Sequence, residues 1–551
     1  MIIDYLDRSL PADLEVDLCV LGTGPAGISI ARSFLHSPLR VCLVESGGFQ
    51  SEGQTQQLCE GTSVGDLPFD AATTRMRAFG GSSNVWGGGC IPLRSADLRA
   101  RAWVPHSGWP LSYAELSPYY LRAKAACGIE SHDVADGTFL TAPTLAPVAF
   151  ESGALVNQVF VRSPVYFGAT YRRELQQASN ITILLHANLL ELLPAADGAR
   201  ISQASIGSID GRRGVIRAKK FVLACGGIEN ARLLLLSSSI NPAGLGNRHD
   251  LVGRYFMDHP SGKLGTLSSG SPNGLTQPYN RYRSKGQGPA HPELCLSDGV
   301  LEAQRLLGGR VRPVAVEAPV PRGIRALREL RTSFSSFSRS RDESMALDGR
   351  MASSASQETP VNAKSPARLA MLGVQAVMGL GDIANAFARR RAGEPVVRTQ
   401  HVDLVGYFEQ APNPASRITL GAEKDLFGQR KVCVDWRFTA LDWHTYRTAG
   451  ALFGTELARA CRAVYHPAPW LSQQGGPPEV CGTSHHMGTT RMSDDPRQGV
   501  VDHQCKVHGI DNLYVVGSSV FPTGGWAFPT FTIVALSLRL AEHLKSPMMF
   551  I

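Results

Sequence analysis

Two adjacent histidines, His485 and His486, stand in the stretch HHMGTTRM at 485–492. An imidazole can ligate a metal, lie in a core with both nitrogens satisfied, or accept a proton from a substrate near neutral pH. For a single histidine taken alone, the satisfied structural role is the commonest. The choice among these three roles depends on the rest of the chain.

A second set of residues has the spacing of a phosphate-binding turn. Gly22, Gly24 and Gly27 form GxGxxG between an apolar run and a helical pattern. The first glycine permits a tight turn, the second lets the backbone approach a pyrophosphate, and the third lets helix and strand pack closely. The helix N-terminus offers free N–H groups to the phosphates. Glu45 ends the next apolar run, where its carboxylate can accept hydrogen bonds from ribose hydroxyls. Together these features predict a bound dinucleotide.

The segment RAFGGSSNVWGGGCIP at 77–92 holds five glycines. Such a backbone can lie flat against a planar ligand and donate several N–H groups where no side chain intrudes. The dinucleotide unit also lies near the N-terminus, and its acid is followed by SGG. Flavoproteins usually use the unit in this way, so we expect FAD rather than NAD.

A parallel sheet is needed to position these residues. From Asp17 the pattern runs strand, glycine turn, helix and strand, which is a βαβ unit. Strand and helix patterns alternate again over about 151–235. Near the C-terminus, the strand pattern NLYVVGSS precedes the helical pattern PTFTIVALSLRLAEHL. The predicted fold class is therefore α/β, with a Rossmann-like domain.

The middle of the chain differs in composition. Residues 331–360 contain nine serines and almost no periodicity, which predicts a flexible insert. The stretch 366–391 has a helical pattern that opens with Pro366 and ends in three arginines, which complement the helix dipole. A basic amphipathic helix can lie on a membrane, but we expect a packed helix with a solvated basic end.

Length and composition limit the class of protein. A chain of 551 residues predicts two or more domains, and 43% apolar with 19% charged residues is typical of soluble globular proteins. The net charge of +8 suits an anionic cofactor but does not indicate nucleic-acid binding. Eleven cysteines without CxxC pairs predict neither a disulfide framework nor a zinc site. No secretory signal and no apolar run of membrane-spanning length is evident, so we expect a cytoplasmic protein without a membrane partner.

The sequence resembles the glucose–methanol–choline (GMC) family of FAD-dependent oxidoreductases. The matching stretches follow the family's order and leave only about 265–400 unmatched; they read VLGTGPAG, RAFGGSSNVWGGG, HSGWPLSYAELSPYY, VLACGGIENARLLL, GRYFMDHP, EQAPNPASRITL, HHMGTTRM and GVVDHQCKVHGIDNLYVVGSSVFPT. The resemblance implies an FAD-binding domain assembled from 1–150, 185–262 and 478–551. It also implies a substrate-binding domain from 151–184 and 263–477, with a mostly antiparallel sheet flanked by helices.

The resemblance further implies where FAD is held. The expected contacts beyond the first glycine turn are Gly81, Ser82, Asn84, Gly87, Gly517, Ser518, Pro529 and Thr530. The helix that begins at Pro529 would direct its positive end toward the negative charge of the reduced flavin. Relatives that bind flavin covalently through a histidine have it just before the tryptophan of the glycine-rich segment. Val85 stands there in this chain, so we expect non-covalent FAD.

The family's catalytic base lies three residues before a glycine in an H-x-x-G-T pattern, which identifies His485 by resemblance. A neutral imidazole can take the hydroxyl proton while a hydride passes from the same carbon to flavin N5, and general-base catalysis contributes about 10²–10⁴-fold in rate. His486 is then structural, or supports the wall of the active site. Many relatives have a second catalytic histidine or asparagine at the position of Phe528, which cannot accept a proton. Either His485 acts alone, His486 replaces the partner, or the reaction is not simple alcohol oxidation.

The resemblance thus implies an FAD-dependent oxidoreductase that oxidises a hydroxyl-bearing carbon of a small polyol, sugar or sugar-like substrate. An FAD-containing lyase or decarboxylase on the same fold is the alternative that Phe528 keeps open. We expect a small hydroxylated molecule as the substrate and no metal. Oxygen, a quinone and another protein all stay open as the electron acceptor.

Overall fold

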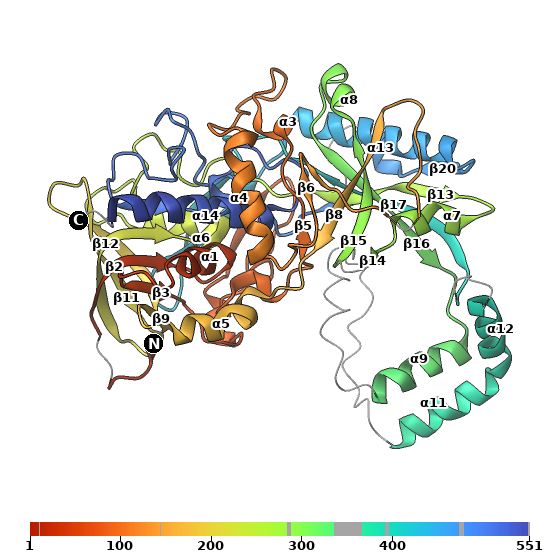
Figure 1. Ribbon diagram of the computed structural model, residues 1–551, viewed down its shortest axis with the longest axis horizontal. Helices are drawn as coiled ribbons and strands as arrows, with labels where there is room; N and C mark the ends of the chain where they lie inside the picture. The colour runs from red at the N-terminus through yellow and green to blue at the C-terminus, as the bar shows by residue number, and fades with distance from the viewer. Residues whose placement is uncertain are drawn as a thin grey trace.

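The computed structural model describes residues 1–9, 12–143, 145–283, 288–334, 366–391, 396–472 and 479–548. Figure 1 shows two bodies side by side, each built on one large sheet. The N-terminus and the last described residues, up to 548, lie in the left-hand body. A group of three helices extends below the right-hand body.

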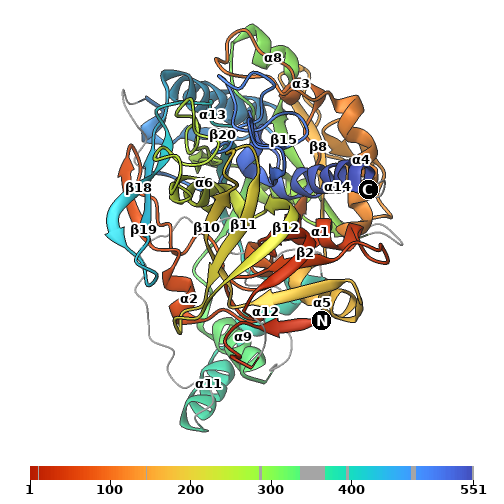
Figure 2. The ribbon, with the colours of Figure 1, turned by 90° about the vertical axis from the view of Figure 1, so that its left-hand side faces the viewer.

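The first sheet has eight strands. Its order is β1 (Ile2–Asp4), β9 (Ile181–Leu185), β3 (Val41–Val44), β2 (Leu14–Leu21), β12 (Arg213–Leu223), β11 (Ile201–Gly207) and β10 (Asn188–Pro194), with β22 (Leu513–Val515) also paired to β12. The strands from β1 to β12, and β22, are parallel. The short apolar runs predicted at β2 and β3 are buried, as expected for a parallel sheet covered on both faces. In Figure 2 this sheet is on the side that faces the viewer, where β2, β12, β11 and β10 are labelled.

Helices on the first sheet complete the predicted βαβ pattern. Helix α1 (Pro25–Ser33) packs between α14 (Pro529–Met548) and α5 (Phe167–Gln177), and α4 (Tyr113–Ala126) packs on α14. Helix α6 (Gly226–Leu236) lies against β10. The predicted α/β class is confirmed. One detail differs from the implied domain division: α5 and β9, which fall mainly within 151–184, belong to this first body because β9 pairs with β1 and β3.

The second sheet has nine strands with antiparallel pairing throughout. Its order is β20 (Val464–Pro467), β13 (Ser261–Ser268), β17 (Thr399–Phe408), β16 (Gly309–Glu317), β15 (Pro289–Leu296), β8 (Leu155–Arg162) and β5 (Gly89–Cys90), with β14 (Tyr282–Arg283) on β15 and β21 (Val480–Cys481) on β13. Helix α13 (Ala440–Ala460) covers one face and buries Phe453 and Leu457 against it. The expected antiparallel sheet is confirmed.

Smaller elements join these bodies. A three-stranded sheet pairs β18 (Arg417–Lys424), β19 (Arg430–Trp436) and β4 (Gly61–Gly65). The remaining short elements are α2 (Gly53–Gln57), α3 (Ser95–Leu98), α7 (Pro272–Thr276), α8 (Asp298–Ala303) and the pair β6 (Val134–Ala135) and β7 (Thr138–Phe139).

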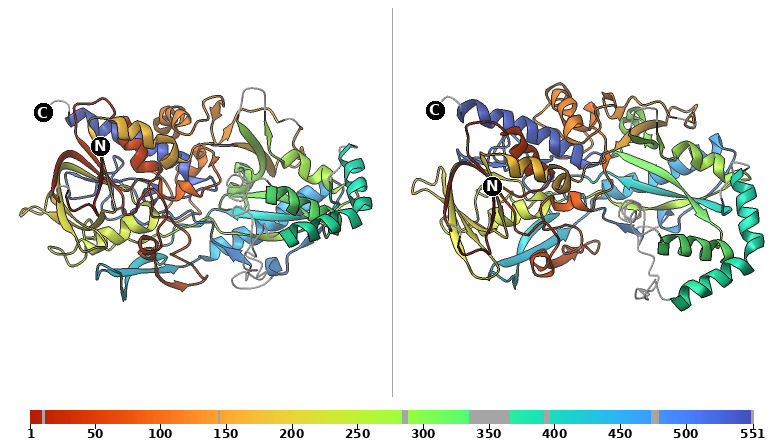
Figure 3. Two further views of the ribbon diagram at one scale, coloured as in Figure 1. Left: turned by 90° about the horizontal axis from the view of Figure 1, so that it is seen from below. Right: turned by 60° about the horizontal axis from the view of Figure 1, so that its bottom comes forward.

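Three helices form an arm beneath the second sheet, seen at the right of both views in Figure 3. They are α9 (Arg322–Phe334), α11 (Pro366–Met378) and α12 (Leu380–Arg391). The predicted helical character of 366–391 is confirmed, but Gly379 divides the stretch into two helices that bend by 69°. The insert predicted at 331–360 begins too early, because 331–334 complete α9. The rest of it lies outside the described residues.

Candidate active site

The carboxyl ends of parallel strands place the predicted cofactor residues at one edge of the first sheet. Gly22 follows β2, Glu45 follows β3, and Gly517 comes two residues after β22. These strands run in the same direction within the sheet, so their carboxyl ends share an edge. Open α/β sheets bind their ligands at this edge.

The first glycine turn leaves room for a phosphate. Gly24 is the N-cap of α1, and no side chain caps the helix there. A Cβ atom added to Gly24 would meet nothing within 4 Å, and a Cβ on Gly81 would lie 3.1 Å from the Gly24 Cα. Gly27 has a different role, because its Cβ would lie 1.9 Å from the carbonyl oxygen of Gly22. The turn therefore needs Gly27 for its own packing and offers open space and free N–H groups at Gly24, which fits a pyrophosphate.

Glu45 is fixed at the end of β3. The Thr23 hydroxyl donates a hydrogen bond to its Oε2, and the backbone N–H of Gly47 donates to its Oε1 at 2.9 Å. Burial raises the pKa of Glu45, while these hydrogen bonds oppose the rise. The carboxylate is held beside the glycine turn, where an acid in a Rossmann unit binds ribose.

The glycine-rich segment folds back on itself in a short 3-10 helix, Gly81–Asn84. Asn84 Nδ2 donates to the carbonyl oxygen of Phe79 at 3.0 Å, and Ser82 Oγ accepts from the N–H of Met76 at 3.2 Å. The carbonyl of Gly87 accepts from the Arg162 guanidinium. These predicted cofactor contacts therefore also shape the loop.

The last predicted cofactor residues lie between β22 and α14. Gly517 has a φ of 117°, and a Cβ there would meet nothing within 4 Å. Ser518 Oγ donates to the carbonyl oxygen of His486 at 2.6 Å, which ties this segment to the histidine pair. Pro529 and Thr530 open α14, the longest helix of the first body.

Gly24→Val should yield a folded protein without flavin. The extended conformation of Gly24, with φ of −67° and ψ of −174°, accepts valine, and the side chain would enter the space left for the pyrophosphate. The measurement is FAD absorbance per polypeptide together with far-ultraviolet circular dichroism. Gly53→Ala is the matched control, since a Cβ there also meets nothing within 4 Å and it should stay yellow. A yellow Gly24→Val protein would place the cofactor elsewhere.

His485 lies against a second histidine, His259. Their rings meet edge to face with centroids 5.1 Å apart, and their Nδ1 atoms are 3.0 Å apart. His259 Nε2 is 2.9 Å from the carbonyl oxygen of Gly525. A carbonyl only accepts, so neutral His259 carries its proton on Nε2 and accepts at Nδ1. His485 must then donate from Nδ1, which leaves its Nε2 with the lone pair of a base.

A buried aspartate, Asp258, fixes the backbone of both histidines in position. Asp258 accepts hydrogen bonds from the backbone N–H groups of His259, Ser484 and His485 at 2.6, 3.0 and 2.8 Å. The Thr483 hydroxyl donates to the carbonyl oxygen of His259 and lies 3.0 Å from His485 Nδ1, so its oxygen is a second acceptor for that N–H. The tautomer of His485 is thus fixed from two sides.

Both imidazoles are held neutral. Burial lowers the pKa of His259 to about 4. Loss of water around the ring, followed by the nearby His259 and the positive charge of Arg310, lowers the pKa of His485 well below its usual value. A neutral imidazole is the form that accepts a proton.

His486 lies among aromatic rings instead. Its ring is edge-on to Phe69 at 5.1 Å and stacked with Phe256 at 6.0 Å between centroids. Burial lowers its pKa to about 3. The structure therefore places His486 in the packing beside the site, and the ring partner of His485 is His259. Within the described ranges, no group of three or more His, Cys, Asp or Glu side chains is arranged to hold a metal ion.

Phe528 forms an aromatic wall of the site. Its ring meets His485 edge to face at 5.6 Å and Phe160 at 5.2 Å between centroids. The Arg310 guanidinium lies 4.4 Å from the ring centroid. Gly89 makes room for it, because a Cβ there would lie 2.7 Å from the phenyl ring. Phe528 is thus packed into position rather than facing open solvent.

Buried charges lie behind this wall. Arg310 on β16 forms an ion pair with Glu293 on β15. Burial opposes ionisation of this carboxyl, but Arg310 holds the pKa of Glu293 at about 2. His291 Nε2 lies 3.5 Å from Glu293 Oε1. The second sheet therefore holds a buried ion pair behind Phe528, with the Arg310 guanidinium next to the phenyl ring.

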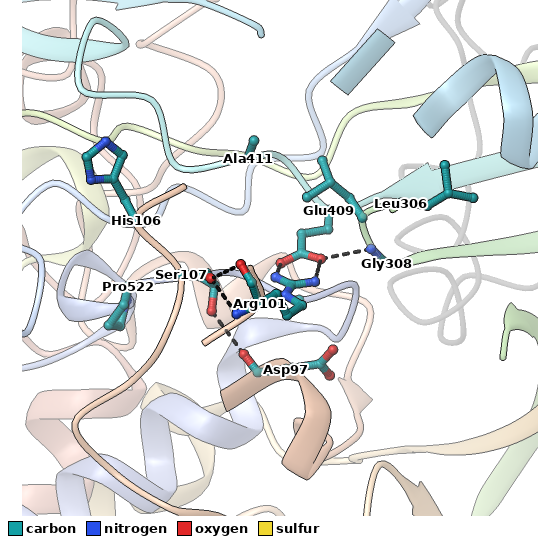
Figure 4. Close-up of polar contacts among 12 residues, drawn as sticks. Asp97, Arg101, His106, Ser107, Leu306, Gly308, Glu409, Ala411 and Pro522 are labelled. Carbon is teal, nitrogen blue, oxygen red and sulfur yellow. Dashed lines mark hydrogen bonds and ion pairs between the residues drawn. The ribbon is translucent and has the colours of Figure 1, made fainter. Parts of the chain in front are cut away.

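A second buried ion pair joins the two bodies, as Figure 4 shows. Arg101 donates from its two terminal nitrogens to Glu409 at 2.8 and 2.5 Å. The N–H of Gly308 donates to Glu409 Oε2 at 2.8 Å. Arg101 follows α3, whereas Glu409 directly follows β17 and Gly308 directly precedes β16. The Arg101–Glu409 ion pair therefore fixes the second sheet relative to the first body.

His259, Arg310, Glu293 and Glu409 were not among the residues predicted for the site. A signal existed for two of them, because His259 lies in GRYFMDHP and Glu409 begins EQAPNPASRITL, both stretches that match the GMC family. Arg310 and Glu293 lie in the unmatched middle, where no pattern singled them out.

Comparisons with known proteins show that the chain is similar to flavin-dependent oxidoreductases. The family model described as GMC oxidoreductase (GMC_oxred_C) matches residues 412–537. The chain is 22% identical to 6'''-hydroxyparomomycin C oxidase of Streptomyces lividus, over 97% of this chain and 92% of that protein. It is also 22% identical to paromamine 6'-oxidase of Streptomyces fradiae, over 96% and 90%. A solved fungal aryl-alcohol oxidase superposes with a TM-score of 0.56 at 14% identity, covering 98% of this chain and 100% of that one.

Proposed function

The chain belongs to the GMC oxidoreductase family of FAD-dependent enzymes that act on CH–OH groups, and we propose that it oxidises an alcohol carbon to a carbonyl. The proposed substrate is a small sugar-like molecule or polyol. The observation that carries this proposal is the His485–His259 pair beside the FAD edge of the first sheet.

The pair prepares His485 as a general base. Gly525 sets the tautomer of His259, and His259 together with Thr483 sets that of His485. The Nε2 lone pair of His485 then takes the substrate's hydroxyl proton. Bound FAD supplies the hydride acceptor. His259 acts as a positioning residue, since it reaches the substrate only through His485.

The absence of a polar group at Phe528 is compatible with this chemistry. The aromatic ring excludes water from one side of His485 and keeps the Arg310 charge on its other side. That charge disfavours the imidazolium form, so His485 is neutral between turnovers.

The substrate class rests on the relatives. Two that match nearly the full chain are named as oxidases of paromamine and of 6'''-hydroxyparomomycin C. A third is a fructose dehydrogenase large subunit, 27% identical over 63% of this chain. Amino sugars, sugars and polyols are therefore the first compounds to test.

The test is an anaerobic screen of those compounds against the purified yellow protein. We expect at least one class to bleach the oxidised-flavin absorbance and yield a carbonyl product. Conversion of substrate with the flavin still oxidised would favour the lyase or decarboxylase alternative. Reoxidation of the bleached protein by oxygen, by a quinone or by a protein acceptor would then identify the electron acceptor.

The pH dependence of kcat/KM should have an acid limb well below 6.5. His485 is active when neutral, and its lowered pKa means that protonation begins only at lower pH than for an ordinary histidine. Activity should therefore be constant from neutral pH downward through 6.5 and fall at more acid pH. A limb centred at 6.5 or above would show that His485 is not desolvated as described.

A further inference from the structure

The arm of α9, α11 and α12 exposes an unusual share of large apolar side chains. Seven of the eighteen exposed large apolar residues among the described ones lie on these three short helices: Leu327, Met371, Val374, Val377, Met378, Leu380 and Phe387. Met378 is 84% exposed and Phe387 is 69% exposed. Exposed apolar side chains gathered on one part of a protein indicate a site of interaction.

The interior of the arm does not account for this apolar content. Its helices make their main contacts with one another, and Gly323 and Gly379 meet so closely that a Cβ on either would lie under 3 Å from the other's backbone. Among the side chains that the structure describes in the arm, those buried inside are Ile324, Ala326, Leu372 and Ala386. The seven larger apolar residues named above are exposed instead. The expected packed helix over 366–391 is two helices that pack on α9 with one face, while the opposite face carries exposed apolar residues.

The outward residues follow helical faces. On α11, Met371, Val374 and Met378 repeat at three- and four-residue spacing, which is one face of a helix. On α12, an open concavity is lined by one face of the helix: Leu380, Ile383, Ala384, Phe387, Ala388 and Arg391. Figure 3 shows both helices on the outside of the arm.

The arm is also strongly basic. Its described residues contain eight arginines and two acids, Glu329 and Asp382, which gives a net charge of +6 against +8 for the whole chain. Arg322, Arg325 and Arg328 repeat at three-residue spacing on α9, and Arg389, Arg390 and Arg391 end α12. Two copies of so basic a surface would repel one another, whereas an anionic surface would attract it.

The dimensions of the arm match a bilayer surface rather than a bilayer core. Among the described residues no single helix is long and apolar enough to cross a membrane, and α11 with α12 reaches that length only as a bent pair. The helices have 13 and 12 residues and diverge by 69°. Short amphipathic helices with arginines beside an apolar face lie in the interface, with the apolar side chains among the acyl chains and the cations at the headgroups.

We propose that this arm binds the surface of an anionic lipid membrane, with the apolar faces of α11 and α12 inserted and the arginines at the lipid phosphates. Membrane binding by this arm does not depend on the reaction at His485. The arm lies on the second body, away from the edge of the first sheet where FAD is expected.

The test is co-sedimentation of the holoenzyme with vesicles of phosphatidylcholine alone and with phosphatidylglycerol added. We expect binding to the anionic vesicles that weakens with salt, and little binding to the neutral ones. Met378→Ser with Phe387→Ser should lower the partition coefficient by about tenfold or more, because the inserted apolar groups are lost. Neutralising the last three arginines, Arg389→Gln, Arg390→Gln and Arg391→Gln, should remove most of the salt-dependent binding.

The matched control is Leu121→Ser with Leu426→Ser, two exposed leucines on other surfaces, which should bind like the wild type. All variants should keep FAD and turnover with a soluble dye, which shows that they are folded. Wild-type protein that ignores anionic vesicles, or a Met378/Phe387 variant that binds as well as wild type, would overturn the proposal. Sedimentation velocity without lipid tests the alternative that this face binds a second copy of the chain. A wild-type dimer that Phe387→Ser converts to a monomer would overturn the membrane proposal in favour of that contact.

Discussion

His485→Ala should fold and retain FAD but reduce its flavin on the order of a hundredfold or more slowly, because the substrate's hydroxyl proton loses its acceptor. The measurement is the anaerobic rate of flavin bleaching after rapid mixing with a substrate found by the screen. We do not expect His259 to replace the lost base, because its Nε2 hydrogen is directed at the Gly525 carbonyl and its Nδ1 faces His485 rather than the substrate.

His486→Ala is the matched control for this variant. The two histidines are adjacent, yet the His486 ring packs on Phe69 and Phe256 while His485 meets His259. The control should therefore lose some stability and keep most of its rate of flavin reduction. Equal slowing of both variants would mean that His486 shares the proton-transfer duty, and a His485→Ala enzyme at full speed would remove the proposed mechanism.

Arg101→Leu should destabilise the protein by about 3–5 kcal/mol, the usual cost of leaving one partner of a buried ion pair without the other. Glu409 is fully buried, and without Arg101 its charge keeps only the Gly308 N–H among the hydrogen bonds described above. The measurement is the urea concentration at which FAD is released, since this pair joins the two bodies around the site.

Two companion variants make that prediction specific. Arg101→Leu combined with Glu409→Gln should recover part of the loss, because the neutral amide still accepts from Gly308 and no buried charge remains. Arg122→Leu breaks the exposed pair with Glu542 and should cost about 1 kcal/mol or less. An Arg101→Leu protein that releases FAD at the wild-type urea concentration would show that the Arg101–Glu409 ion pair does not hold the two bodies together.

The glycine turn could be predicted from sequence because its function depends only on the backbone conformation and close packing of a few neighbouring residues. Gly24 must leave space and Gly27 must let the helix approach the strand, and both needs follow from spacing alone. The same holds for Glu45, which only has to end the next strand. His485 was reachable through resemblance, since it stands at a fixed distance from Gly488.

The partner of His485 could not be predicted in this way. His259 is 226 residues away in the chain, and its contact depends on how the segment before β13 pairs with the segment before Gly488. The solvent exposure of residues 366–391 could not be predicted either, because the sequence pattern of an apolar helix is the same whether its apolar face is buried in a core or exposed. Only the tertiary structure shows that Met378 and Phe387 are exposed.

In the proposed reaction, a carbon–hydrogen bond of an alcohol is broken next to the bound flavin while His485 accepts the hydroxyl proton. Anaerobic single-turnover flavin reduction tests this most directly, with the best substrate unlabelled and deuterated at the carbon that is oxidised. We expect a primary isotope effect on bleaching, stoichiometric formation of the carbonyl product, and bleaching slowed strongly in His485→Ala. Product formed while the flavin stays oxidised, or bleaching with no isotope effect at a rate untouched by the loss of His485, would contradict it.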